Sequence, residues 1–105
     1  MTTGQKSRAV SYLEKLAGGP MTLGRALQAI RKGEEETLAV FAKRLGISSA
    51  HLCDIEKGRR MVSPARAARW AHKLGYSERM FVLYALQDLV HHEGLKYRIS
   101  VEDAA

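Results

Sequence analysis

The sequence predicts an all-α protein with one short β-strand near its end, folded as a single domain over residues 1–105. Apolar residues recur at helical spacing through most of the chain. Capping residues and glycines divide this pattern into short, closely spaced helices. Strict alternation of apolar and polar residues, which is typical of a strand, begins only after Gly94. The length fits one domain, and neither a linker nor a repeat interrupts it.

The chain begins with an accessory helix predicted over residues 5–17, which the Gly18-Gly19-Pro20 sequence ends. A second helix follows, with Thr22 as its N-cap and its end near Gly33. The apolar stripe of this second helix consists of Leu23, Leu27 and Ile30.

Two short helices with a very tight connection come next, from Thr37 to Leu45 and over residues 49–57. Gly46 ends the first helix, where a positive φ is favoured, and Ser48 provides an N-cap for the second. The connection is too short for antiparallel packing, so the two helices should cross at a steep angle. Steeply crossing helices of this kind, with small and apolar residues at the contact, are the requirements of a helix–turn–helix motif.

The final part of the chain is predicted to contain two more helices and the strand. Ser63-Pro64 begins a helix that ends at Gly75, and the last helix spans residues 78–93. From Met80 to Val90 the last helix has more apolar residues than one buried stripe needs, which favours a second apolar contact. Since no other segment pairs with the strand over residues 95–101, we expect a homodimer through helix 78–93 and this strand.

The central segment resembles the Cro/lambda-repressor (Xre) family of helix–turn–helix DNA-binding proteins. The resemblance covers roughly residues 22–76 and rests on residues that fall in register with the family pattern. Those residues are Phe41-Ala42-Lys43-Arg44-Leu45-Gly46-Ile47-Ser48, then Leu52, then Ile55-Glu56-Lys57-Gly58.

The resemblance implies a five-helix lambda-repressor-like domain that binds double-stranded DNA as a dimer, with the helix after Ser48 in the major groove. Small Xre-type proteins also include antitoxins, so the alternative is an antitoxin that binds a toxin protein and represses its own promoter. The residues expected to face the groove are Ser49, Ala50, His51 and Asp54, with Lys57, Arg59 and Arg60 near phosphates. Ser48 and Lys43 complete the set of residues expected to bind DNA.

One position departs from the family pattern. The family usually has a glutamine that binds a phosphate at the start of the first helix of the motif, and this chain has Leu38 there. Arg31, Lys32 or Lys43 should then supply the missing phosphate contact.

The charge distribution agrees with a nucleic-acid partner. The net charge is +6, and residues 57–73 contain six basic and no acidic side chains. Such a cluster repels itself unless a polyanion meets it, although a solvated basic surface is the simpler alternative. RNA binding is a weaker alternative because no aromatic residues interleave with the basic ones. A membrane partner is not expected, since no apolar run approaches the ~20 residues that span a bilayer.

No pattern predicts an enzyme, a cofactor or a metal site. The adjacent His91 and His92 diverge by ~100° on a helix and cannot share a metal ion easily. The single cysteine, Cys53, suits a reducing compartment, and residues 1–20 contain no apolar signal-peptide core. We therefore expect a cytoplasmic protein.

Overall fold

The computed structural model describes residues 21–104, and the accessory helix predicted over residues 5–17 lies outside them. The described residues form five helices and no strand. The helices are α2 (Leu23–Gly33), α3 (Leu38–Leu45), α4 (Ser49–Glu56), α5 (Pro64–Leu74) and α6 (Glu78–His92).

The helices begin and end where the sequence predicts. Each N-cap hydroxyl accepts a hydrogen bond from the backbone N–H three residues later, which satisfies one of the free donors of the first turn. Gly46 and Gly75 follow α3 and α5 with φ of 78° and 79°, the left-handed conformation that favours glycine. The N-caps are Thr22, Thr37, Ser48, Ser63 and Ser77.

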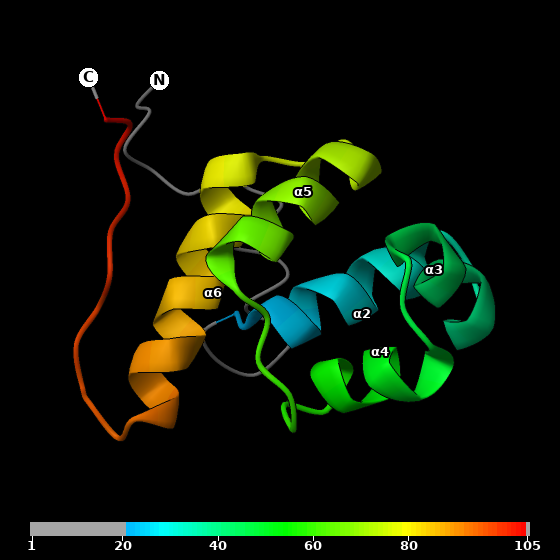
Figure 1. Ribbon diagram of the computed structural model, residues 1–105, viewed down its shortest axis with the longest axis horizontal. Helices are drawn as coiled ribbons and strands as arrows, with labels where there is room; N and C mark the ends of the chain where they lie inside the picture. Colours follow the sequence, from blue (N-terminus) through cyan, green and yellow to red (C-terminus); the bar gives the residue numbers. More distant parts are fainter. Residues whose placement is uncertain (1–20, 105) are drawn as a thin grey trace.

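Helix α2 runs through the middle of the molecule, with α3 and α4 on one side and α5 and α6 on the other (Figure 1). The core contains side chains from α2 and from the helices on both of its sides. The completely buried ones include Leu27 of α2, Phe41 of α3, Leu52 of α4 and Phe81 of α6. Burial of such side chains stabilises the fold by about 1.5–3 kcal/mol each. The motif that contains α3 and α4 is therefore anchored to the rest of the domain through α2.

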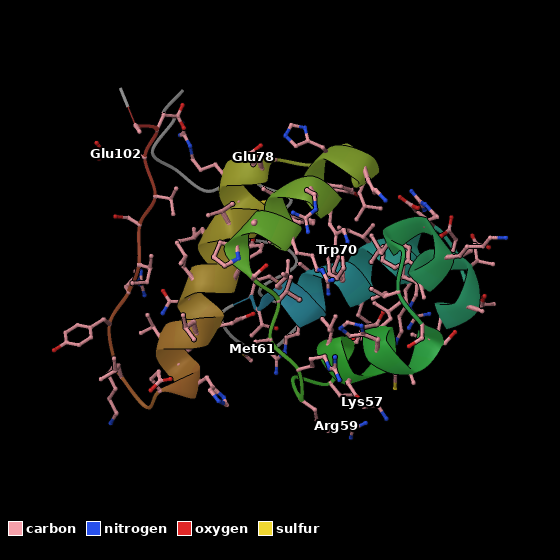
Figure 2. The ribbon with its side chains drawn as sticks, in the orientation of Figure 1. Lys57, Arg59, Met61, Trp70, Glu78 and Glu102 are labelled. Atoms are coloured by element: carbon pink, nitrogen blue, oxygen red, sulfur yellow. The ribbon has the colours of Figure 1, made fainter. Side chains whose placement is uncertain are left out.

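Trp70 connects α5 to the end of α3. The indole lies in the core (Figure 2), and its Nε1–H donates a hydrogen bond of 3.1 Å to the carbonyl oxygen of Leu45. That carbonyl belongs to the last turn of α3, where no helical N–H is available to it. The contact is a structural one, as expected for a tryptophan in a helix that packs on the core.

Residues 95–104, called the tail below, run back beside α6 without forming the strand expected over residues 95–101 (Figure 1). A strand requires a second strand to complete its hydrogen-bond ladder, and none lies beside the tail among residues 21–104. The Gln87 side chain takes that place: its Nε2 donates to the Tyr97 carbonyl and its Oε1 accepts from the Ile99 N–H, each at 2.7 Å.

The tail also covers part of the second apolar face of α6, which the sequence analysis assigned to a dimer partner. Arg79 of α6 forms an ion pair of 2.9 Å with Asp103. Val82 and Val101 line the same shallow hollow between α6 and the tail. The tail therefore covers part of the apolar surface of α6 that one buried stripe does not need.

Candidate nucleic-acid interface

Helix α4, the candidate reading helix, lies unusually close to α2. A Cβ atom placed on Gly24 of α2 would be 2.1 Å from the carbonyl oxygen of Ile55, so only glycine permits this approach. Leu52 and Ile55 are buried beneath α4 and fix its inner face. The opposite face of α4 is thus held outward on a rigid base.

An ion pair that is largely buried joins the same two helices. The guanidinium of Arg31 donates two hydrogen bonds to the Glu56 carboxylate, of 2.8 and 2.9 Å, and a third of 3.0 Å to the carbonyl oxygen of Glu36. The hydrogen bonds to Glu56 raise the pKa of Arg31. Arg31 is occupied by these contacts. Lys32 and Lys43 therefore remain as candidates for the phosphate contact that a glutamine makes in the Cro/lambda-repressor pattern.

The first turn of α4 is exposed, as an end that enters a groove must be. Ser48, Ser49 and Ala50 are all exposed, and the Ser48 hydroxyl caps the helix by accepting the N–H of His51 at 3.0 Å. Ser49 and Ala50 are therefore free to meet base edges, whereas Ser48 already has a structural role.

His51 is half-buried, and its Nε2 lies 3.4 Å from the guanidinium of Arg60. Burial lowers the pKa of His51, and the charges of Arg60 and Arg66 lower it further. The imidazole is consequently neutral at pH 7, when one nitrogen donates and the other accepts. Arg66 was not among the residues expected from the sequence, because the approach of the first turn of α5 to α4 has no local signal.

Asp54 is paired with Arg59 across the end of α4. Their closest approach is 3.1 Å, and both side chains remain partly exposed. This pairing reduces the repulsion between Asp54 and a phosphate. It also partly neutralises the charge of Arg59. Arg59 therefore differs from Lys57, with which the sequence analysis grouped it.

The remaining predicted cations are exposed. Lys57 and Arg59 lie at the outer edge of the molecule beside the end of α4 (Figure 2), while Lys43 projects from α3 as an exposed side chain. No ion pair involves Lys43, Lys57 or Arg60 among the described residues. These three side chains can approach phosphates without breaking an internal pair.

Leu38, which stands where the Cro/lambda-repressor pattern that the chain resembles has glutamine, begins α3 and packs partly against the core. It supplies apolar contact there and offers no side-chain donor to a phosphate.

No helix within residues 21–104 is both long and apolar enough to cross a bilayer.

Comparison with known proteins gives one family. The model of a helix-turn-helix domain family matches residues 22–81, more than half of the chain and the whole segment from α2 into α6. No curated protein and no solved structure gave a match.

Proposed function

The chain belongs to this helix-turn-helix domain family, and from that premise we propose that it is a sequence-specific regulator of transcription rather than an enzyme. It binds double-stranded DNA in the cytoplasm and represses a promoter by occupying it. The observation that carries the proposal is the α4 geometry: an exposed first turn on a helix whose inner face is fixed to α2. A helix held in this way can enter the major groove without losing its own packing.

The exposed residues of α4 suit the reading of bases. Ser49 can donate or accept, the small Ala50 can contact a thymine methyl group, and Asp54 can accept from the amino group of cytosine. The neutral His51 adds a donor or an acceptor, depending on its tautomer. Base reading is therefore assigned to Ser49, Ala50, His51 and Asp54.

Phosphate contacts are assigned to Lys43, Lys57 and Arg60, which have no internal ion pairs among the described residues. Such contacts position a protein on the duplex and weaken as salt rises, because each one releases condensed counterions. Arg59 contributes less to this group, since Asp54 already holds part of its charge.

Recognition of a palindromic operator further requires two copies of the chain. A homodimer can place two α4 helices about 34 Å apart, one turn of DNA, so that both read the same face of the duplex. We propose that α6 and the tail form the homodimer contact.

An antitoxin is the second candidate, and exposed apolar side chains on the tail favour it. Leu95 is 49% and Tyr97 69% exposed, which is unusual for large side chains without a partner. Co-expression with the product of an adjacent small gene separates the two candidates. An antitoxin should co-purify with that product as a stoichiometric complex, and a simple repressor should remain a homodimer.

The DNA-binding proposal is tested by selecting duplexes from a random pool with the full-length protein. A consensus with two-fold symmetry is expected, bound more tightly than random DNA at physiological salt. Failure of any sequence to exceed random DNA would overturn the proposal.

The two classes of contact can then be separated on the selected duplex. Lys57→Ala should weaken all duplexes alike and reduce the slope of log K against log salt by roughly one unit. Ser49→Ala should change the preferred bases at one position, at a cost of ~1–3 kcal/mol, and leave the salt slope unchanged. Lys73→Ala, in the exposed last turn of α5, serves as a control of equal charge. The assignment fails if Lys57→Ala changes base preference while the salt slope stays the same.

A further inference from the structure

The tail of the single chain is an extended segment with hydrogen-bond partners along only one of its two edges among the described residues. The Gln87 side chain binds the Tyr97 carbonyl and the Ile99 N–H. In an extended chain, backbone groups of residues i and i+2 point to the same edge. The odd-numbered residues therefore face α6, and the even-numbered residues direct their N–H and C=O groups to the opposite edge.

That opposite edge is unpaired in the described part of the chain. No backbone group of Lys96, Arg98 or Ser100 takes part in a hydrogen bond with any residue between 21 and 104. Unpaired groups of this kind form a template for a second strand, and proteins normally cover or blunt such an edge. Two large apolar side chains of the tail are also highly exposed, Leu95 at 49% and Tyr97 at 69%.

We propose that the free edge of the tail pairs in antiparallel orientation with the tail of a second copy, with Ile99 on the two-fold axis. The inference rests on the homodimer of the proposed function and names its register. Because both tails present even-numbered residues at the free edge, each even-numbered residue must pair with an even-numbered residue of the second copy. The midpoint between two even numbers is a whole number, so the two-fold axis passes through a residue and not between two residues.

The longest ladder of favourable pairs selects Ile99 among the possible residues. With Ile99 on the axis, Lys96 of each tail lies opposite Glu102 of the partner subunit, and Tyr97 lies opposite Val101 of the partner subunit. Opposite charges and aromatic–β-branched pairs are both stabilising across an antiparallel ladder, by roughly 0.2–1 kcal/mol each. Each favourable pair occurs twice because of the symmetry.

The neighbouring registers are less favourable. An axis through Arg98 places two Arg98 side chains opposite each other, and an axis through Tyr97 places Lys96 opposite Arg98 of the partner subunit. Like charges in these positions are destabilising. An axis through Ser100 also pairs opposite charges, Arg98 with Glu102 of the partner subunit, but it places Asp103 of the partner subunit, a carboxylate that the partner's Arg79 already holds, inside the ladder opposite Tyr97. An axis through Ile99 leaves that Asp103 at the end of the ladder, opposite Leu95.

The test is disulfide formation in the full-length chain with Cys53→Ser as the background, so that each variant has one cysteine. In the proposed register the two Ile99 residues form a non-hydrogen-bonded pair, whose Cα atoms are about 4.5 Å apart and within disulfide range. An Ile99→Cys variant at micromolar concentration should therefore give covalent dimer under mild oxidation. Arg98→Cys and Ser100→Cys would be diagonal to their counterparts, at about 7–8 Å, and should give little.

Chance collisions cannot mimic this result. Arg98 and Ser100 are exposed and Ile99 is only half-exposed, so collisional crosslinking would favour the two control variants. Gln87→Ala, which removes the side-chain hydrogen bonds to Tyr97 and Ile99, should reduce crosslinking through position 99. Gln28→Ala, a change of the same chemistry on α2, should not.

The outcomes separate the register from the function. Preferential crosslinking at position 98 or 100 overturns the register, and a dimer in sedimentation without any crosslink overturns pairing through the tail. A monomer at micromolar concentration overturns the homodimer itself. Because crosslinking is measured without DNA, loss of operator selection would contradict the DNA-binding proposal and not this one.

Discussion

The ion pairs Arg31–Glu56 and Arg79–Asp103 have nearly equal lengths, 2.8 and 2.9 Å, but lie in opposite surroundings. The side chains of the first are 13% and 4% exposed, and those of the second are 57% and 80% exposed. The first joins α2 to the candidate reading helix, and the second joins α6 to the tail. Similar geometry thus accompanies very different energetics, because water screens the exposed pair and not the buried one.

The difference separates a rigid region from an exchangeable one. Between α2 and α4, the buried ion pair and the close approach at Gly24 fix a single arrangement. Between α6 and the tail, the Gln87 hydrogen bonds and one exposed ion pair are few and open to solvent. The reading helix is consequently held in place, while the tail can take a new partner at low cost.

The largest effect is expected when the buried pair is broken. Glu56→Ala leaves the Arg31 guanidinium buried without its carboxylate, which should lower the free energy of unfolding by about 3–5 kcal/mol. Urea unfolding followed by circular dichroism measures the loss. Glu34→Ala, which removes an exposed partner of Arg44, is the control and should cost less than ~1 kcal/mol. Equal effects of the two variants would abolish the contrast between buried and exposed pairs.

The close approach of α2 and α4 can be broken without changing any charge. Gly24→Ala places a methyl group against the Ile55 carbonyl, and the required backbone shift should cost about 3 kcal/mol. Gly33→Ala is matched in chemistry and has no atom within 4 Å of the new methyl group. It should be neutral or slightly stabilising by thermal unfolding. A stable Gly24→Ala protein with normal DNA binding would contradict the rigid region.

The contact between α6 and α2 should show an intermediate effect through pH. Asp88 accepts the N–H of Leu23 at 3.1 Å, and burial raises its pKa from the ordinary value of 3.8 to about 6, although that hydrogen bond and the charge of His91 oppose the shift. The folded state therefore binds more protons than the unfolded state near pH 5. The free energy of unfolding should rise by on the order of 1 kcal/mol from this group as pH falls from 7 to 5.

Urea unfolding at the two pH values measures the change, and Asp88→Asn removes the titrating group. The variant should lack this part of the pH dependence while the other carboxylates and histidines titrate as before. If wild type and variant change equally between pH 7 and pH 5, Asp88 does not titrate in this range.

The smallest effect is expected at the tail. Arg79→Ala removes the exposed ion pair with Asp103 and should change the free energy of unfolding by less than about 0.5 kcal/mol. Thermal unfolding of the full-length chain provides the measurement, with Glu56→Ala as the reference for a large effect. A loss above ~2 kcal/mol would mean that the tail is as firmly fixed as α4.

The sequence predicts the helices well because their signals are local. Hydroxyl N-caps such as Ser48 and Ser63, and left-handed glycines such as Gly46, act within one helical turn, so neighbouring residues are enough to place each boundary. The family match over residues 22–81 agrees with the motif predicted from Gly46 and its flanking apolar residues.

Contacts between distant residues could not be predicted in the same way. Arg31 and Glu56 are 25 positions apart, and nothing local distinguishes them from the exposed charges nearby. Arg31 was therefore one of three residues, with Lys32 and Lys43, expected to supply a phosphate contact. Arg59 was grouped with Lys57 although it is paired with Asp54. The alternation after Gly94 predicted a strand, which the described residues do not contain, because a strand also requires a partner that this alternation alone does not supply.

Trp70 gives the protein an optical reporter of its own. It is the only tryptophan in the chain, its ring is 3% exposed, and its indole N–H is bound to the last turn of α3. Its fluorescence emission should be blue-shifted in the folded protein and move to longer wavelength when α3 separates from α5. Arg66 connects this ring to the first turn of α4, since its guanidinium lies 5.7 Å from the ring centroid and its charge lowers the pKa of His51, so the same fluorescence can also report a change beside the reading helix when DNA binds.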